Sequence, residues 1–279
     1  MDPFRTTLIL TSYVALIVSL PGNIFIIVKN VLDLWKNRRL LLSDWLMLGF
    51  SFFSFLQVCN EGFVLYLDLY HLPSNIHVFM YLNMCTLWFS ALLSLHFCLK
   101  IVQINHWLYI CLQRRFPELF PWIIVGFLLG FLILNFYSTI DPKAECSSNT
   151  TSSVVSIRCS WLKLIFLTSC FLFTFLCSLS ALTILISLMK HVRRIQDNTE
   201  GSGSPSIKAH IRAVRTVTTL LAASVCTSTM VPILVWSDGS WPFLCVILYL
   251  ICYTLTSYFF IKGTKKLNET LSQILGRCY

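Results

Sequence analysis

Long apolar stretches alternate with short polar segments along the whole chain. Each stretch reaches about 20 residues, the length that an α-helix needs to cross a hydrocarbon core about 30 Å thick. The apolar residues run continuously and do not alternate with polar ones, so the pattern predicts an all-α membrane protein and not transmembrane β-strands. Seven spans are expected, at about residues 7–29, 43–67, 77–100, 118–140, 161–189, 213–235 and 241–261.

Composition supports this prediction and changes the meaning of the net charge. Hydrophobic residues make up 56% of the 279 residues and charged residues 12%, against about 25% charged in a typical soluble domain. So much apolar surface cannot be buried inside a soluble globule of this size, which excludes a soluble enzyme. The net charge of +9 therefore indicates loops that face anionic membrane lipid, not a surface that binds nucleic acid.

The distribution of Lys and Arg predicts the orientation of the spans. If the N-terminus lies outside, the outer segments hold only Arg5, Lys143, Arg158 and Lys163, and the inner segments hold the other 17 of the 21 Lys and Arg. Positive residues accumulate on the cytoplasmic side of membrane proteins. We therefore expect a multi-pass plasma-membrane protein with its N-terminus outside and a short cytoplasmic tail at 262–279.

The outer loop at about 141–160 carries a glycosylation sequon at Asn149 and two cysteines, Cys146 and Cys159. A disulfide between these cysteines would close a 14-residue ring and contribute about 3 kcal/mol by the loop-entropy argument. Free thiols are the alternative, and the sequence does not decide between the two. A second sequon, at Asn268, falls in the predicted cytoplasmic tail and is expected to stay unmodified.

The sequence holds no recognisable catalytic motif. It lacks G-x-S-x-G, the P-loop, H-E-x-x-H and C-x-x-C, and its six His are scattered over loops and helix ends. These motifs place nucleophiles, phosphate-binding loops and metal ligands at fixed spacings. We therefore expect neither an enzyme nor a cofactor or metal site, and seven short-looped spans favour a receptor.

Three polar residues inside the spans need an explanation, because polar groups in lipid are costly. Asp44 opens the second span after Ser43, where an acid caps free amides and meets the positive end of the helix dipole, so a structural role is favoured. Asn23 is expected to bond to a neighbouring helix. Glu61, toward the outer end of the second span, either contacts a cationic ligand or reaches interfacial water; the sequence favours neither.

Trp88 is the aromatic residue whose depth stands out. It lies about eleven residues into the third span, or roughly 16 Å below the surface, whereas Trp prefers the membrane interfaces. A Trp at this depth either packs between helices or lines a cavity, where it offers an apolar face and one N–H donor to a ligand. Position alone favours packing.

Seven short-looped spans suggest a G-protein-coupled receptor, but the rhodopsin-like D-R-Y and N-P-x-x-Y motifs are missing. Instead, three blocks resemble the type 2 (bitter) taste receptors: LWFSALLSLHFCLKI at 87–101, SLSALTILISLMKHVRRI at 178–195 and SPSIKAHIRAV at 204–214. The chain is similar to a divergent member of that family. The Ser-Arg that the family has in the second span is Phe53-Ser54 here, and Leu92 stands where an Asn is frequent.

This resemblance implies a receptor for small, often bitter, molecules, with a pocket in the outer half of the bundle and coupling to a gustducin-type heterotrimeric G protein. By this resemblance, Trp88 is expected to line the pocket. The residues assigned to ligand binding are Trp88, Phe89, Leu92, Glu61, Val246 and Tyr249. Those assigned to coupling at the inner ends of spans three, five and six are Lys100, His191, His210 and Arg212.

Two other functions remain in competition. A type 1 vomeronasal (pheromone) receptor has a related fold, and the AHIRA block favours taste over it. A transporter or channel needs ionisable residues along a path through the membrane, and only Glu61 and Asp44 are available.

Overall fold

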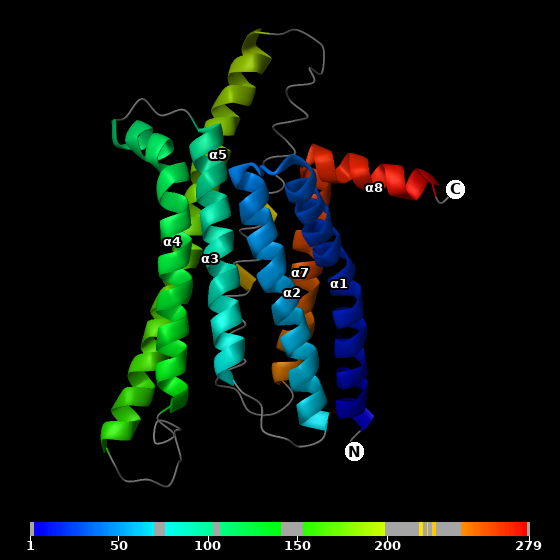
Figure 1. The fold of residues 1–279 in the computed structure, drawn as a ribbon, viewed down its shortest axis with the longest axis vertical. Helices are drawn as coiled ribbons and strands as arrows, with labels where there is room; N and C mark the ends of the chain where they lie inside the picture. The colour runs from blue at the N-terminus through cyan, green and yellow to red at the C-terminus, as the bar shows by residue number, and fades with distance from the viewer. Residues whose placement is uncertain are drawn as a thin grey trace.

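The computed structural model describes residues 3–69, 76–102, 107–140, 153–198 and 241–277, with isolated helical positions between 218 and 226. Within these residues the regular elements are helices (Figure 1). In chain order they are α1 (Pro3–Asn37), α2 (Leu42–Leu69), α3 (Ile76–Ile101), α4 (Trp107–Ile140), α5 (Ser153–Asn198), α7 (Trp241–Gly263) and α8 (Lys265–Arg277).

Helices α1 to α5 each contain a segment long and apolar enough to cross a membrane. The fold is therefore a membrane-spanning helical bundle, as the apolar pattern predicts. The predicted sixth span, 213–235, lies outside the described residues except for the isolated positions. Helix α7 corresponds to the predicted seventh span, and α8 lies within the predicted tail.

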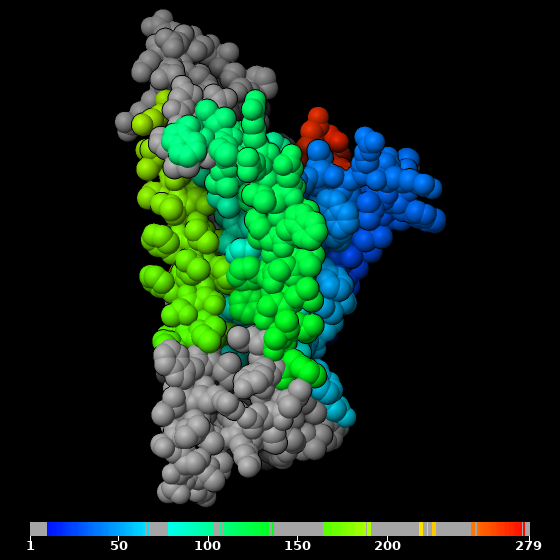
Figure 2. All heavy atoms as spheres, turned by 60° about the vertical axis from the view of Figure 1, so that its left-hand side comes forward, coloured from blue at the N-terminus to red at the C-terminus, as the bar shows by residue number. Residues whose placement is uncertain are grey.

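Helix α3 is the internal helix of the bundle. It packs against α2 on one side and against α4 and α5 on the other, whereas α1 and α7 pack against each other and against α2. In Figure 2, α4 and α5 stand side by side and α3 is visible between them. In the apolar segment of α3 72% of the residues are buried, against 11% in α4, so α4 turns most of its side chains outward.

Several helices extend beyond the predicted spans. Helix α1 continues to Asn37 and ends where Arg38 adopts a positive φ of 51°. The Arg38 amide donates to the Leu34 carbonyl at 2.8 Å, an αL cap. Helix α5 starts at Ser153, inside the predicted outer loop. The apolar pattern reports only the lipid-embedded part, while backbone hydrogen bonds continue a helix into polar segments.

Aromatic rings fill the contacts of α2 with α3 and α7. Phe89 on α3 stacks on Phe53 with ring centroids 5.4 Å apart, and a Cβ added at Gly49 would overlap the Phe89 ring. Glycine at this position therefore lets the two helices approach closely. On the α7 side of α2, the ring of Phe50 contacts Tyr253 and Phe260, with ring centroids 6.3 and 5.2 Å apart respectively.

Helix α8 runs crosswise to the bundle, at the end where α1 finishes and α2 begins (Figure 1). We call this end of the bundle the α8 end and the opposite one the distal end. A single residue, Thr264, separates α7 from α8, and its hydroxyl contacts the Met47 sulfur of α2 at 3.5 Å. The turn between the two helices is therefore packed on α2.

Candidate functional site

Helix α2 carries a buried acid in the distal half of the bundle. Glu61 is 3% exposed and lies eight residues before the distal end of the helix at Leu69, or about 12 Å from it. Gln57, one turn closer to α8 and fully buried, donates from Nε2 to Glu61 Oε1 at 3.2 Å. Glu61 is thus enclosed by protein and does not extend into interfacial water.

The direction of Glu61 follows from its helical register with Phe50. The two residues are eleven apart, and eleven residues at 100° each fall within about 20° of three full turns. Phe50 contacts Tyr253 and Phe260 of α7. Glu61 therefore lies on the α7 side of α2, three turns farther toward the distal end.

The two α7 residues assigned to ligand binding lie near the same level. Val58 of α2 and Leu250 of α7 belong to one buried apolar cluster. Glu61 lies about one turn on the distal side of Val58, and Val246 and Tyr249 lie within about one turn on the distal side of Leu250. The side chains of Val246 and Tyr249 are outside the described residues, so the backbone alone sets their level on α7.

Trp88 faces a different pair of helices. Its ring stacks on Phe127 of α4 with centroids 3.6 Å apart and planes 15° from parallel, and it lies 5.2 Å from Phe173 of α5. The indole Nε1 is buried without a hydrogen-bond partner among the described residues. Trp88 thus helps to hold α3, α4 and α5 together and keeps one unused N–H donor within that part of the chain.

Phe89 and Leu92 complete the α3 candidates and are both core residues. Phe89 packs on the Gly49–Phe53 surface of α2 and is 4% exposed. Leu92 is also 4% exposed and belongs to the main apolar core. The candidates with described side chains therefore fall into two regions: Glu61 on the α7 side of α2, and the α3 residues against α2, α4 and α5.

Asn23 bonds to a neighbouring helix, as the sequence predicts. Ser257 on α7 donates from its hydroxyl to Asn23 Oδ1 at 2.8 Å, and Asn23 Nδ2 donates to the Ser19 carbonyl of its own helix at 3.3 Å. Gly22 makes room for this contact, because a Cβ there would come within 2.8 Å of the Ser257 Cβ. A buried polar bond thus ties α1 to α7.

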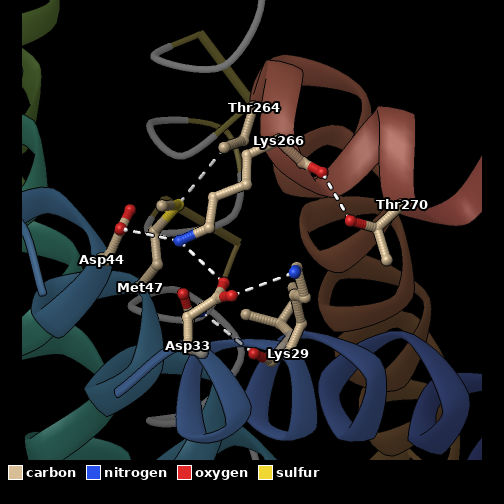
Figure 3. A network of polar contacts seen from close by, with 9 residues as sticks. Lys29, Asp33, Asp44, Met47, Thr264, Lys266 and Thr270 are labelled. Atoms are coloured by element: carbon tan, nitrogen blue, oxygen red, sulfur yellow. Dashed lines mark hydrogen bonds and ion pairs between the residues drawn. The ribbon is translucent and has the colours of Figure 1, made fainter. Parts of the chain in front are cut away.

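At the α8 end, Lys266 joins three helices (Figure 3). Its Nζ lies 2.8 Å from Asp33 Oδ2 of α1 and 3.3 Å from Asp44 Oδ2 of α2. Asp33 is also paired with Lys29, one turn earlier on α1, at 3.0 Å. Desolvation lowers the pKa of Lys266, but hydrogen bonding to Asp33 and the charge of Asp44 outweigh it, so the net shift is upward.

The structural role predicted for Asp44 agrees with these contacts. Asp44 lies in the first turn of α2 and is 6% exposed, where the helix dipole favours an acid. For its partner Lys266, the sequence indicates only a positive charge in the predicted cytoplasmic tail. Asp33 has one local signal, the i,i+4 spacing from Lys29.

Little of the predicted coupling surface is within the described side chains. Lys100 is exposed on the last turn of α3. His191 lies on α5 with its side chain outside the described residues, and His210 and Arg212 are outside them entirely, as are Cys146 and Asn149. Cys159 lies on α5, again without a described side chain.

Tyr109 is a further residue at the α8 end that sequence reasoning missed. Its hydroxyl lies 2.8 Å from the Cys98 carbonyl and 2.9 Å from the Val102 carbonyl. It therefore donates at the C-terminal end of α3, where the Cys98 carbonyl also accepts from the Val102 amide at 3.0 Å. A Tyr in a predicted loop gives no signal of this role.

Comparison with known proteins gives one consistent result. A family model described as "Taste receptor protein (TAS2R)" matches residues 1–278. A Rattus norvegicus protein named "Taste receptor type 2 member 41" is 29% identical over 272 residues, covering 87% of this chain and 86% of the relative. A Macaca mulatta protein named "Taste receptor type 2 member 7" is 27% identical over 240 residues, covering 79% and 75% respectively.

The family match extends over nearly the whole chain, beyond the three blocks that resemble the family. It agrees with the helical membrane bundle and decides between the competing functions, because the family model and these relatives are named as taste receptors and not as vomeronasal receptors or transporters. The chain belongs to the type 2 taste receptor family and is a multi-pass chemosensory membrane receptor.

Proposed function

We propose that this chain is a bitter taste receptor of the plasma membrane. It crosses the membrane seven times with its N-terminus outside, binds small agonists in the distal half of the bundle and activates a gustducin-type heterotrimeric G protein at the α8 end. The observation that carries the ligand part of the proposal is the buried Glu61–Gln57 pair in the distal half of a taste-receptor bundle.

The orientation is supported by the charge bias of the sequence. The tail helix carries Lys265 and Lys266, and α1 carries Lys29 and Lys36 near the same end. Positive residues favour the cytoplasmic side. In this orientation the distal end is extracellular, so an agonist from outside reaches Glu61 after passing about two turns of α2.

Two contact regions contribute to agonist binding in this proposal. Glu61, with Val246 and Tyr249 on α7, supplies the polar contact of the α2–α7 side. Trp88 supplies the aromatic surface of the α3 side and an N–H that has no acceptor among the described residues; Phe89 and Leu92, both buried, support its helix. A mostly apolar site with few polar groups is typical of small-molecule recognition.

Coupling requires inner helix ends that can move relative to a fixed part of the bundle. Asn23–Ser257 and the Lys266 ion pairs link α1, α2, α7 and α8 into one connected unit. We assign the moving part to the inner ends of spans three, five and six, with Lys100, His191, His210 and Arg212. Agonist binding then shifts the population between two arrangements of these ends.

The test is a calcium assay in cells that express the chain with a promiscuous Gα, screened against a panel of bitter compounds. Reproducible, concentration-dependent responses that depend on both the receptor and the Gα are expected. A receptor that reaches the cell surface, as measured by an epitope tag, yet gives no response to any compound contradicts the proposal.

A further inference from the structure

The ligand class can be taken one step further at the buried acid of α2. We infer that Glu61 recognises the ammonium group of a cationic agonist, a lipophilic amine that carries a positive charge at neutral pH. This inference rests on the proposed function, because it names the chemistry of an agonist that binds in the distal half of the bundle.

Glu61 differs in its hydrogen-bond partner from Asp33 and Asp44, the two other buried acids in the described part of the chain. Asp33 and Asp44 are buried to a similar extent, at 7% and 6% exposure, and both are ion-paired with Lys266. Glu61 is more deeply buried, at 3%, yet within the described chain its hydrogen-bond partner is the neutral amide of Gln57. A buried carboxylate is costly without a cationic partner. An agonist that brings a cation would serve Glu61 as Lys266 serves the two aspartates.

The chemistry around Glu61 favours an organic ammonium over an inorganic ion. Gln57 uses its Nε2 to donate to Glu61, and its Oε1 is buried without a hydrogen-bond partner among the described residues. The pair therefore presents a carboxylate and an amide oxygen to a donor, which matches the N–H groups of a protonated amine. A hard divalent cation instead requires about six or more oxygen ligands.

The neighbouring residues select for an apolar body on the amine. Val58 and Leu250 form a buried cluster about one turn from Glu61 toward the α8 end, with Ala15, Leu16 and Leu20 of α1 packed against it. Because an agonist enters from the distal end, this cluster lies beyond its ammonium and closes the α8 side with aliphatic side chains in place of water. The ammonium therefore loses its hydration, and burial of apolar surface on the ligand has to offset that cost, so small hydrophilic amines are expected to act weakly.

The experiment compares secondary aralkylamines, whose nitrogen is bonded to aliphatic carbon and is protonated at neutral pH, with their own N-acetyl derivatives, which keep the scaffold but carry no charge. Both panels are applied to cells that express wild-type receptor and a promiscuous Gα. Agonists are expected mainly among the amines, each at least about thirtyfold more potent than its acetyl derivative. Equal potency of amines and acetyl derivatives on the wild type overturns the inference without any mutation.

Glu61→Gln provides the second arm, because it removes the charge and keeps the shape and a hydrogen-bonding partner for Gln57. Amine potency is expected to fall by about thirtyfold or more at matched surface level, whereas any uncharged agonist keeps its potency. Glu61→Asp retains the charge and should keep part of the preference for amines. Glu118→Gln, which removes an exposed acid of α4, is the matched control and should leave the ratio unchanged.

The outcomes separate this inference from the proposed function. If uncharged compounds activate the wild type and amines lose no potency in Glu61→Gln, the receptor function stands and the ammonium site is wrong. If neither class activates a wild-type receptor that reaches the cell surface, the proposed function fails and the inference that rests on it fails with it.

Discussion

Lys266 on α8 places its ammonium 2.8 Å from the carboxylate of Asp33 on α1. The two residues are far apart in sequence, and the same ammonium also contacts Asp44 on α2. Because one cation serves two carboxylates on different helices, its removal leaves both acids less compensated. The ion pairs of Lys266 therefore help to hold α8 against both α1 and α2.

Lys266→Ala is expected to lower the thermal stability of the purified receptor. Lys266 is partly exposed, with a side-chain exposure of 38%, so we expect a loss of about 1 kcal/mol, or about 2–4 °C in apparent Tm. The measurement is thermal unfolding in nanodiscs at one fixed scan rate. Lys265→Ala removes the adjacent lysine, whose pair with Glu269 is exposed at 3.8 Å, and should change Tm by much less. Equal effects of the two substitutions would contradict a structural role for the Lys266 contacts.

Gly49→Ala is expected to disturb the contact of α2 with α3. The added methyl overlaps the Phe89 ring, and overpacking in a buried contact costs about 1–3 kcal/mol. Gly126→Ala on α4 is the matched control, because a Cβ there has no neighbour within 4 Å and alanine favours the helix by up to about 1 kcal/mol. Surface expression and Tm should fall for the first variant and stay level or rise for the second.

Trp88→Ala is expected to reduce agonist potency by about 5- to 150-fold, equivalent to roughly 1–3 kcal/mol. The stack with Phe127 and Phe173 means that the same substitution lowers folding yield, so responses must be compared at equal surface level. Trp88→Phe keeps much of the stacking and removes the N–H. An agonist that accepts a hydrogen bond from the indole should lose potency in this variant too. Unchanged dose–response curves in both variants would remove Trp88 from the agonist site.

The orientation can be tested through the two sequons. With the N-terminus outside, Asn149 is extracellular and Asn268 cytoplasmic, so only Asn149 can receive an N-linked glycan. Glycosidase treatment should therefore change gel mobility in the wild type and in Asn268→Gln, but not in Asn149→Gln. A glycan that disappears in Asn268→Gln would contradict the seven-span topology.

His210→Ala is expected to alter basal activity or maximal response more than agonist affinity. The predicted topology places this residue at the inner end of span six, about 20 Å or more by helix length from an agonist site in the outer half. A His carries little charge at neutral pH with an unperturbed pKa near 6.5, so anchoring to anionic lipid does not explain it. The measurement is basal and agonist-stimulated nucleotide exchange in membranes at matched receptor density. A shift in affinity alone, with basal exchange and maximal response intact, would exclude a switch role.

Adjacent residues on α3 illustrate why the candidate site could be predicted only in part. Depth along the helix identifies Trp88 as a deep aromatic residue, and the sequence places Phe89 beside it. On a helix, however, neighbours in sequence point about 100° apart. Trp88 consequently faces α4 and α5, whereas Phe89 faces α2. Whether both side chains line one pocket therefore depends on the positions of the neighbouring helices, which the sequence of α3 does not give.

Asn23 shows the same limit for a prediction that was confirmed. A buried amide in lipid needs a partner, so a bond to another helix follows from the residue type and its position. The partner itself, Ser257, is 234 residues away in the sequence. It meets Asn23 because α1 packs beside α7, and the sequence does not indicate this packing. In the same way the sequence indicates a structural role for Asp44 but not the contribution of Lys266.

The amino-acid sequence alone determined the membrane class, the apolar helices α1 to α5 and the family, because hydrophobicity, helical length and short motifs are local properties. In lipid each helix satisfies its own backbone hydrogen bonds, so the spans follow from composition without knowledge of their neighbours. Only the tertiary structure decided which side chains meet: the acids that Lys266 joins, the helices that Trp88 faces, and the absence of a cationic partner for Glu61 in the described chain. Such contacts depend on which faces of distant helices pack together.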